Sequence, residues 1–356
     1  MREKKKIAVF FSSGIGNAVM LVPLLKLLKR NNQNHISIIL TSPFITPEFL
    51  EFNNFPNDNI IDLRNKKTGL FALKYLNNFD KSYLDYSSSS VKNLFLASII
   101  SKKSFAYRKN KVFIPRINYM KPYINIHAVV LHAKMIDQSI GSDNFSLDLM
   151  KLNIINPIKE FVYKLKSLNK KIFTVQISSG NNKAKFKNWP IEYWIVFLKK
   201  ILNTYENIII VLLGDKNEIK SGKRVTDEIN NSNLYNMIGK TSLVEASIIL
   251  YNSNLYIGLD SAFMHLSVAY NIPSFIILGA SSEKFIGYNQ FDPGKHAVIY
   301  KDLFCRPCHG WIGTNTRRVK SPKDCNDLDC LTELNPEKVF EEFYDYYSKT
   351  MEFQNL

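Results

Sequence analysis

The stretch that decides the fold is Leu255-Tyr256-Ile257-Gly258-Leu259-Asp260-Ser261-Ala262-Phe263-Met264-His265. Its apolar opening at 255–257 predicts a short buried strand, and residues 262–270 predict a helix that follows a tight turn. A strand, a turn and a helix in this order form the repeating unit of doubly wound α/β proteins. The same unit recurs along the chain, so we expect mostly parallel sheets.

The alternation of strands and helices runs through the chain twice, with a lapse near 153–157. A chain of 356 residues is also long enough for two hydrophobic cores. We therefore predict an α/β protein with domains at 1–156 and 157–335, followed by a helix in 336–356 that could return to the first domain. The predicted strands are 7–11, 36–40, 60–63, 83–86, 172–177, 208–213, 234–237, 255–257 and 274–278, and the predicted helices include 18–29, 48–53, 70–77, 91–100, 218–229 and 243–251.

The chain carries a formal net charge of +16. Such an excess predicts an anionic partner, which could be nucleic acid, a phosphorylated substrate or the inner face of a bacterial membrane. The apolar start of the chain is interrupted by Ser12, Ser13 and Gly14, so it indicates a strand and a loop rather than a signal peptide. No uninterrupted apolar stretch reaches the ~18 residues of a membrane span. We expect a cytoplasmic protein with at most peripheral membrane contact.

Ligands of open α/β sheets bind at the carboxyl ends of strands, so the loops there are the candidate sites. The first is Ser12-Ser13-Gly14-Ile15-Gly16-Asn17, whose glycines would let a ligand approach the start of a helix. Only two glycines of the G-x-G-x-x-G fingerprint are present, so the loop indicates a dinucleotide site weakly. A tight strand-to-helix turn would explain the same glycines.

The second loop begins with Ser178-Ser179-Gly180 and leads through Lys183, Lys185 and Lys187 to Trp189-Pro190. Small hydroxyl residues and a mobile ammonium together supply several hydrogen-bond donors and a point charge for a diphosphate. A solvated basic loop is the alternative interpretation.

The third loop lies in the deciding stretch itself. Asp260 or Ser261 could cap the helix, and the free N–H groups of Ser261, Ala262 and Phe263 could bind a phosphate. His265 follows Ser261 by four residues and so shares its helix face. The alternative is a plain capping aspartate with a packed histidine.

Four cysteines are crowded into one segment, at Cys305, Cys308, Cys325 and Cys330. In a reducing compartment such a cluster is more naturally a metal site than a pair of disulfides, and a tetrahedral thiolate site needs four ligands. We predict one structural zinc or iron ion, with His309 as a substitute ligand. Reduced thiols buried in a loop are the alternative.

Taken together, several strings resemble glycosyltransferase family 9, the lipopolysaccharide heptosyltransferase family, over most of the chain. The resemblance is strongest between residues 172 and 335. It is carried by Lys187-Asn188-Trp189-Pro190, Leu213-Gly214-Asp215, Ile238-Gly239-Lys240-Thr241-Ser242-Leu243, Asp260-Ser261-Ala262-Phe263-Met264-His265 and Asn271-Ile272-Pro273.

The resemblance implies a GT-B fold, in which two doubly wound Rossmann-like domains face each other across a cleft, the acceptor side first and the donor domain second. It implies an inverting, metal-independent transfer of a sugar from a nucleotide-diphosphate donor such as ADP-heptose. The acceptor would be lipopolysaccharide, another glycan, a lipid-linked molecule or a protein. By the same resemblance, Lys187 and the backbone of Ser261, Ala262 and Phe263 hold the donor's diphosphate. The other donor-site residues are Ser178, Ser179, Gly180, Gly214, Lys240 and Thr241. The catalytic candidates are Asn17, Asp260 and His265.

Two substitutions depart from the family pattern. Asn17 stands where relatives have the aspartate thought to act as base, and an amide cannot take a proton near neutral pH. Ala262 replaces the glycine of the D-S-G string. If Asn17 only orients the acceptor, another group must take the proton, and the sequence offers His127, Asp143 and His265.

Two other function classes compete with the transferase. One is a non-catalytic nucleotide-sugar-binding protein that kept the donor pocket and lost the base. The other is a zinc-ribbon nucleic-acid binder, which the net positive charge and the cysteines favour. It lacks aromatic residues interleaved on a basic face, so we do not expect nucleic acid as a partner.

Overall fold

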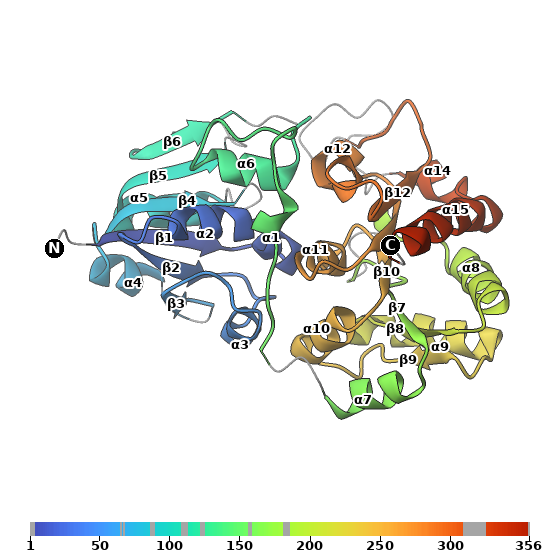
Figure 1. Ribbon diagram of the computed structural model, residues 1–356. Coiled ribbons are helices and arrows are strands. Elements are labelled where there is room, and N and C mark those ends of the chain that lie inside the picture. Colours follow the sequence, from blue (N-terminus) through green and yellow to red (C-terminus); the bar gives the residue numbers. More distant parts are fainter. Residues whose placement is uncertain are drawn as a thin grey trace. The chain divides into compact units, whose positions relative to one another are not determined.

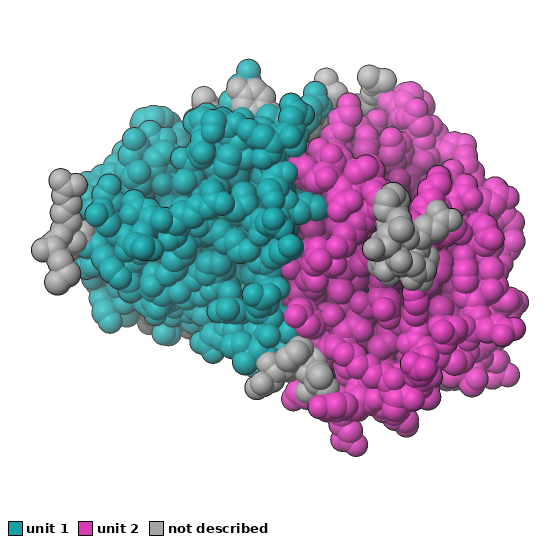
Figure 2. Space-filling model, viewed as in Figure 1, with its two compact units in different colours: residues 1–155 teal, residues 156–356 magenta. Residues whose placement is uncertain are grey.

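The computed structural model describes residues 4–64, 66, 68–85, 90–107, 113–121, 125–155, 159–180, 186–308 and 325–354 (Figure 1). The chain divides into two compact units, residues 1–155 and 156–356 (Figure 2). Each unit is built on one parallel six-stranded sheet.

The sheet of unit 1 has the strand order β3-β2-β1-β4-β5-β6, and every neighbouring pair is parallel. The order reverses between β1 and β4, because the chain first builds outward to β3 and then returns to continue on the other side. Such a reversal is the place where doubly wound sheets bind ligands. The strands are β1 Lys5–Phe11, β2 Asn34–Leu40, β3 Asn59–Asp62, β4 Phe79–Leu84, β5 Ser101–Tyr107 and β6 Ile117–Met120.

The helix predicted at 18–29 is in fact two helices, with a break at Leu21. Pro23 lies in the first turn of the second helix, where its missing N–H group is tolerated. The strand predicted at 83–86 ends earlier, at Leu84, so Asp85 is the first residue beyond the sheet. The helices of unit 1 are α1 Ile15–Met20, α2 Val22–Lys29, α3 Pro47–Phe52, α4 Thr68–Lys74, α5 Val91–Ile100 and α6 Ala128–Lys134.

The sheet of unit 2 repeats this topology with the order β12-β11-β10-β7-β8-β9. Here the order reverses between β7 and β10, and all neighbouring strands are again parallel. The strands are β7 Lys171–Val175, β8 Ile208–Leu212, β9 Leu234–Asn236, β10 Leu255–Leu259, β11 Ser274–Leu278 and β12 His296–Tyr300. The helices are α7 Glu160–Ser167, α8 Ile191–Thr204, α9 Ile219–Ile229, α10 Leu243–Tyr251, α11 Ala262–Ala269, α12 Glu283–Ile286, α14 Asp329–Thr332 and α15 Pro336–Gln354.

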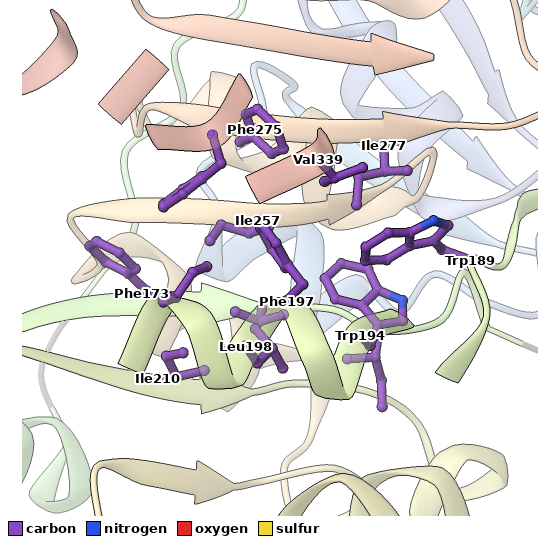
Figure 3. Close-up of a cluster of buried hydrophobic side chains, with 14 of the residues drawn as sticks. Phe173, Trp189, Trp194, Phe197, Leu198, Ile210, Ile257, Phe275, Ile277 and Val339 are labelled. Carbon is purple, nitrogen blue, oxygen red and sulfur yellow. The ribbon is translucent and has the colours of Figure 1, made fainter. Parts of the chain in front are cut away.

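The core of unit 2 lies between its sheet and helices α8 and α15. Figure 3 shows Trp194, Phe197 and Leu198 of α8 beside strand residues such as Phe173 and Phe275. The final helix belongs to this core, because Val339 and Phe343 are fully buried in it and the Phe343 ring meets those of Phe197 and Phe275 edge to face. The Asn335 side chain accepts from the N–H of Lys338, which caps α15 at its predicted start.

Candidate functional site

The reversal point of unit 2 brings together the loops that follow β7 and β10. These two strands are neighbours, although 80 residues separate Gln176 from Tyr256 along the chain. The loop after β7 carries Ser178–Gly180 and continues to Lys187, while the loop after β10 carries Asp260 and Ser261. The sequence-predicted second and third loops are therefore parts of one site. Residues 181–185, with Lys183 and Lys185, lie outside the described residues.

An ion pair joins the two loops. The Lys187 Nζ lies 2.7 Å from Oδ2 of Asp260, and it also donates to the Asp260 carbonyl at 3.3 Å. The two side chains are only 11% and 9% exposed, so most of the water around both charges is excluded. Removing either residue would leave the other as a buried charge without its partner, which is strongly destabilising. Each residue therefore depends on the other.

The Asp260 carboxylate is held in its ionised form. Burial alone would raise the Asp260 pKa, but the charge and hydrogen bond of Lys187 and the hydrogen bond of Ser281 outweigh it and keep the pKa below its ordinary value. The Ser281 hydroxyl donates to the same Oδ2 from the loop after β11. Asp260 is therefore neither a helix cap nor a free acid, and the capping interpretation of this residue is wrong.

The Ser261 side chain does not cap helix α11 either. Its hydroxyl donates to Oε1 of Gln176 at 2.6 Å, and the Tyr256 hydroxyl donates to the same oxygen at 3.1 Å. This buried network fixes the turn that starts α11. Ala262 and Phe263 occupy the first turn, where backbone N–H groups lack acceptors within the helix. The turn thus has the form expected of an anion site.

His265 is buried and its Nδ1 lies 2.8 Å from the Tyr288 hydroxyl. Burial lowers the pKa of His265 to about 4. The imidazole is therefore neutral near pH 7, and such a low pKa makes it a weak proton acceptor. Its contacts fit a packed histidine as well as a catalytic one.

Glu218, which the sequence interpretation missed, ties the loops after β7 and β8 together. Its carboxylate accepts from the Gly180 N–H at 3.1 Å, from the Asp215 N–H at 2.8 Å and from Ser178. Burial raises the Glu218 pKa. A side chain on Gly214 would collide with this carboxylate, so glycine there is explained by packing. Gly180 has a φ of +78°, a conformation that favours glycine.

The remaining donor-site candidates lie farther along the sheet. Lys240 and Thr241 follow β9, which is the edge strand and is separated from β10 by β8 and β7. Lys240 is exposed and its Nζ donates to the Asn236 carbonyl at 2.8 Å. These contacts show how the loop is held, and the role of both residues in donor binding stays a prediction.

The reversal point of unit 1 carries a different pair. The Ser13 hydroxyl, in the loop after β1, donates to Oδ2 of Asp85 at 2.6 Å, and Asp85 is 2% exposed at the end of β4. Asn17 lies in the first turn of α1, half-buried. Gly14 has an ordinary φ of −71°, and a side chain there would meet nothing within 4 Å. A tight turn therefore does not explain Gly14 in this loop.

Two of the alternative bases fit their structural surroundings poorly. His127 is fully buried and its Nδ1 accepts from the Val129 N–H at 3.2 Å, as the N-cap of α6. Asp143 is exposed in a loop that follows α6. Asp85 is not among the sequence-predicted site residues, because the strand predicted at 83–86 included it. β4 ends at Leu84, and a carboxylate directly after a strand is a candidate site residue.

The four cysteines are all free thiols. Burial raises the pKa of Cys330 to about 12, and the charges of Cys308, Cys325 and Cys305 contribute to the rise, so the four groups lie near one another. Among the described residues, however, no three His, Cys, Asp or Glu side chains are arranged as a metal-ligand set. The described residues therefore contain no preformed metal site, and His309 lies outside the described part of the chain.

The cysteine segment is nevertheless connected to the candidate donor site. Arg306, between the first two cysteines, is 4% exposed and donates to the carbonyls of Gly279 and Ser281, both at 2.7 Å. Its guanidinium also pairs with Glu283 at 3.1 Å. Since the Ser281 hydroxyl donates to Asp260, the arginine supports the loop that orients this carboxylate.

A family model described as glycosyltransferase family 9 (heptosyltransferase) matches residues 93–310, more than half of the chain. The chain belongs to glycosyltransferase family 9. The family match and its relatives establish a glycosyltransferase enzyme, as the sequence predicts. One relative is lipooligosaccharide heptosyltransferase 2 of Campylobacter jejuni, serotype O:6, which is 27% identical over 350 residues, or 95% of this chain and 98% of the relative.

Solved structures of heptosyltransferases confirm the fold of this family 9 member. The ADP-heptose LPS heptosyltransferase II of E. coli superposes with a TM-score of 0.71 at 19% identity, covering 96% of this chain and 98% of that one. The iron-containing heptosyltransferase TibC of enterotoxigenic E. coli, solved with ADP-D-β-D-heptose, gives 0.55 at 10% identity over 98% of this chain and 78% of TibC. The two doubly wound sheets are thus those of the GT-B fold. None of the helices in the described part is long and apolar enough to cross a membrane.

The buried ion pair gives a stability prediction. Lys187→Met leaves the Asp260 carboxylate buried without its counter-ion and should lower the free energy of unfolding by about 3–5 kcal/mol. Adding Asp260→Asn should recover much of this loss. The three tryptophans, at positions 189, 194 and 311, all belong to unit 2, so urea unfolding followed by tryptophan fluorescence reports on this unit.

The matched control is Lys223→Met. Lys223 pairs with Asp227 on the surface, where the two side chains are 73% and 58% exposed, so its loss should cost less than about 1 kcal/mol. Equal effects of Lys187→Met and Lys223→Met would contradict the dependence of Asp260 on Lys187.

Proposed function

We propose that the protein transfers a heptose from an ADP-heptose donor to a lipooligosaccharide or lipopolysaccharide acceptor. The observation that carries the proposal is the buried Lys187–Asp260 pair at the start of α11, in the reversal point of unit 2. The family membership and the lipooligosaccharide heptosyltransferase among its relatives support the sugar and the acceptor class.

The donor's diphosphate would bind where α11 begins. The N–H groups of the first turn, from Ser261 to Phe263, supply hydrogen bonds, and the positive end of the helix dipole favours the negative charge. Lys187 adds a cation held in position by Asp260. Charge grows on the diphosphate as the bond to the sugar breaks, so donors that are already in place stabilise the transition state. This assistance needs no metal ion.

The acceptor would bind unit 1. A cavity of about 440 Å³ lies at the carboxyl ends of β5 and β6, and Lys121, Lys134 and the aromatic rings of Tyr107 and Tyr119 contribute to its lining. Ammonium groups beside aromatic rings suit a phosphorylated sugar. The Ser13–Asp85 pair lies at the end of β1 and β4 in the same unit.

The proton of the acceptor hydroxyl would leave through Ser13 and Asp85. As the acceptor oxygen forms its bond to the anomeric carbon, its proton passes to Ser13 Oγ while the Ser13 proton moves to Oδ2 of Asp85, and the diphosphate leaves with the bonding electrons. Asp85 would thereby replace the carboxylate that relatives carry at the position of Asn17. The Asn17 amide would align the acceptor.

The competing interpretation is a non-catalytic binding protein that retained the donor pocket. The substitution of Asn17 raises it from the sequence alone, but the family match and the heptosyltransferase relatives do not support it, and the Asp85 carboxylate beside the same loop offers a replacement for the lost group. Incubation with ADP-heptose and a heptose-deficient lipooligosaccharide should release ADP and add the mass of one heptose to the acceptor. Binding of the donor with neither transfer nor hydrolysis would favour the binding protein.

For the proton acceptor, Asp85→Asn should lower kcat by about 10²–10⁴-fold, the range of general base catalysis, while donor affinity stays unchanged. Asp80→Asn is the control, because Asp80 lies near the other end of the same strand, where it accepts from the Lys6 N–H and pairs with Lys102. A parent-like kcat for Asp85→Asn would exclude Asp85 as the proton acceptor.

In the same assay Asn17→Asp should retain or raise activity, and Asn17→Ala should lower it through lost acceptor alignment. If Asn17→Ala behaves like the parent enzyme, the first loop is only a turn at this position.

We also infer that Cys305, Cys308, Cys325 and Cys330 hold one structural zinc or iron ion. The four free thiols lie near one another, and the iron-containing TibC shares the fold. The described thiols are not already arranged as metal ligands, so binding of the ion would draw them together. Arg306 would transmit the added rigidity to the loop at Ser281.

Elemental analysis of anaerobically purified protein should then find about one zinc or iron ion per chain, the stoichiometry of a four-thiolate site. Cys308→Ser should remove the metal and lower the melting temperature, with chemistry at saturating donor retained. Metal-free parent protein would refute this proposal.

A further inference from the structure

The positive charge of the chain is concentrated in unit 1. Between residues 63 and 136 the sequence holds fourteen lysines and arginines but only two acidic residues, Asp80 and Asp85. This excess of twelve accounts for most of the +16 of the whole chain. The segment includes helices α4 and α5 in full.

Helices α4 and α5 cover one face of the unit 1 sheet. Their inner sides contribute Phe71 and Leu94 to the same buried cluster as the strand residues Ala8 and Phe10. The two helices also contact each other. Their outer sides therefore form one continuous surface of the unit.

That outer surface is unusually apolar. Leu70 and Leu73 on α4 are 67% and 74% exposed, and Phe95 on α5 is 59% exposed. Leu76, just after α4, and Val91, the first residue of α5, are also exposed. Thirteen large apolar side chains are exposed among the described residues, and these five lie on or next to α4 and α5, whereas isolated exposed residues are normal and need no explanation.

The charged residues within α4 and α5 are all basic. Lys66, Lys74 and Lys92 are exposed, and no Asp or Glu occurs in either helix. A groove of about 390 Å³ along α4 is lined by Leu70 and Phe71 together with Lys66 and Lys74. Apolar side chains bordered by ammonium groups match the headgroup region of a bilayer that contains anionic lipids.

We propose that this α4–α5 face, defined by Leu70, Leu73, Leu76, Val91 and Phe95 with the three lysines, docks the enzyme on an anionic membrane. The proposal rests on the proposed function in one respect, because a lipid-anchored acceptor requires the enzyme to work at a membrane surface. The lysines supply long-range attraction that salt screens, and the leucines and phenylalanine enter the interface. Neither contribution alone gives stable binding, so both should be needed.

The test is sedimentation of the full chain with vesicles, in the absence of donor and acceptor. Parent protein should bind phosphatidylcholine vesicles that contain phosphatidylglycerol, bind pure phosphatidylcholine at least ~10-fold more weakly, and lose the anionic binding in high salt. Leu73→Glu with Phe95→Glu should weaken anionic binding at least ~10-fold, because two carboxylates replace two inserted side chains.

The control is Tyr163→Glu with Leu168→Glu, which adds the same charge at two exposed positions of unit 2 and should bind like the parent. Unchanged far-ultraviolet circular dichroism and unchanged resistance to limited proteolysis verify that unit 1 is folded in both double variants, because tryptophan fluorescence and ADP affinity report only on unit 2. Equal binding by the two double variants would overturn the proposal, as would absence of parent binding. A variant that changes only self-association would also overturn it and assign the face to a second copy. A failed transfer assay with intact vesicle binding would refute the proposed function and leave the docking face standing.

Discussion

The carboxyl edge of the unit 2 sheet depends on the buried Lys187–Asp260 ion pair. Lys187 comes from the loop after β7 and Asp260 from the loop after β10, so the pair joins the two loops at the reversal point of the sheet. Ser281 adds a hydrogen bond from a third loop, and Arg306 holds that loop in turn. A change in any one of these loops therefore reaches the carboxylate at the start of α11.

The two units share one strand order, but their reversal points present different charged groups. The reversal point of unit 1 presents a buried carboxylate behind a serine, Asp85 and Ser13. In unit 2 the same topological position presents a cation and the start of a helix. In the proposed mechanism the first arrangement would remove a proton and the second would bind the departing diphosphate, so a repeated fold would serve two complementary steps.

Much of this fold could be predicted from the sequence because the central strands are continuous apolar runs. The pattern misses β5, β6 and β12. Lys102 and Lys103 interrupt β5, β6 is short, and β12 opens with His296. The loops of the candidate donor site could be selected from the sequence through their serines, glycines and aspartate. Glu218 and Arg306 could not be ranked above other charged residues, because their importance comes from burial and from partners distant in the sequence.

Helix α15 has a consequence for the synthesis of the protein. Phe343 and Val339 fill the core of unit 2 beside α8, which is made well over a hundred residues earlier. While the ribosome adds the intervening residues, the apolar side of α8 has no final partner, whereas unit 1 is already complete in sequence. Domains generally fold as units during synthesis, the N-terminal one first. Unit 1 can therefore fold early, and unit 2 waits with an open core that chaperones can recognise until α15 emerges.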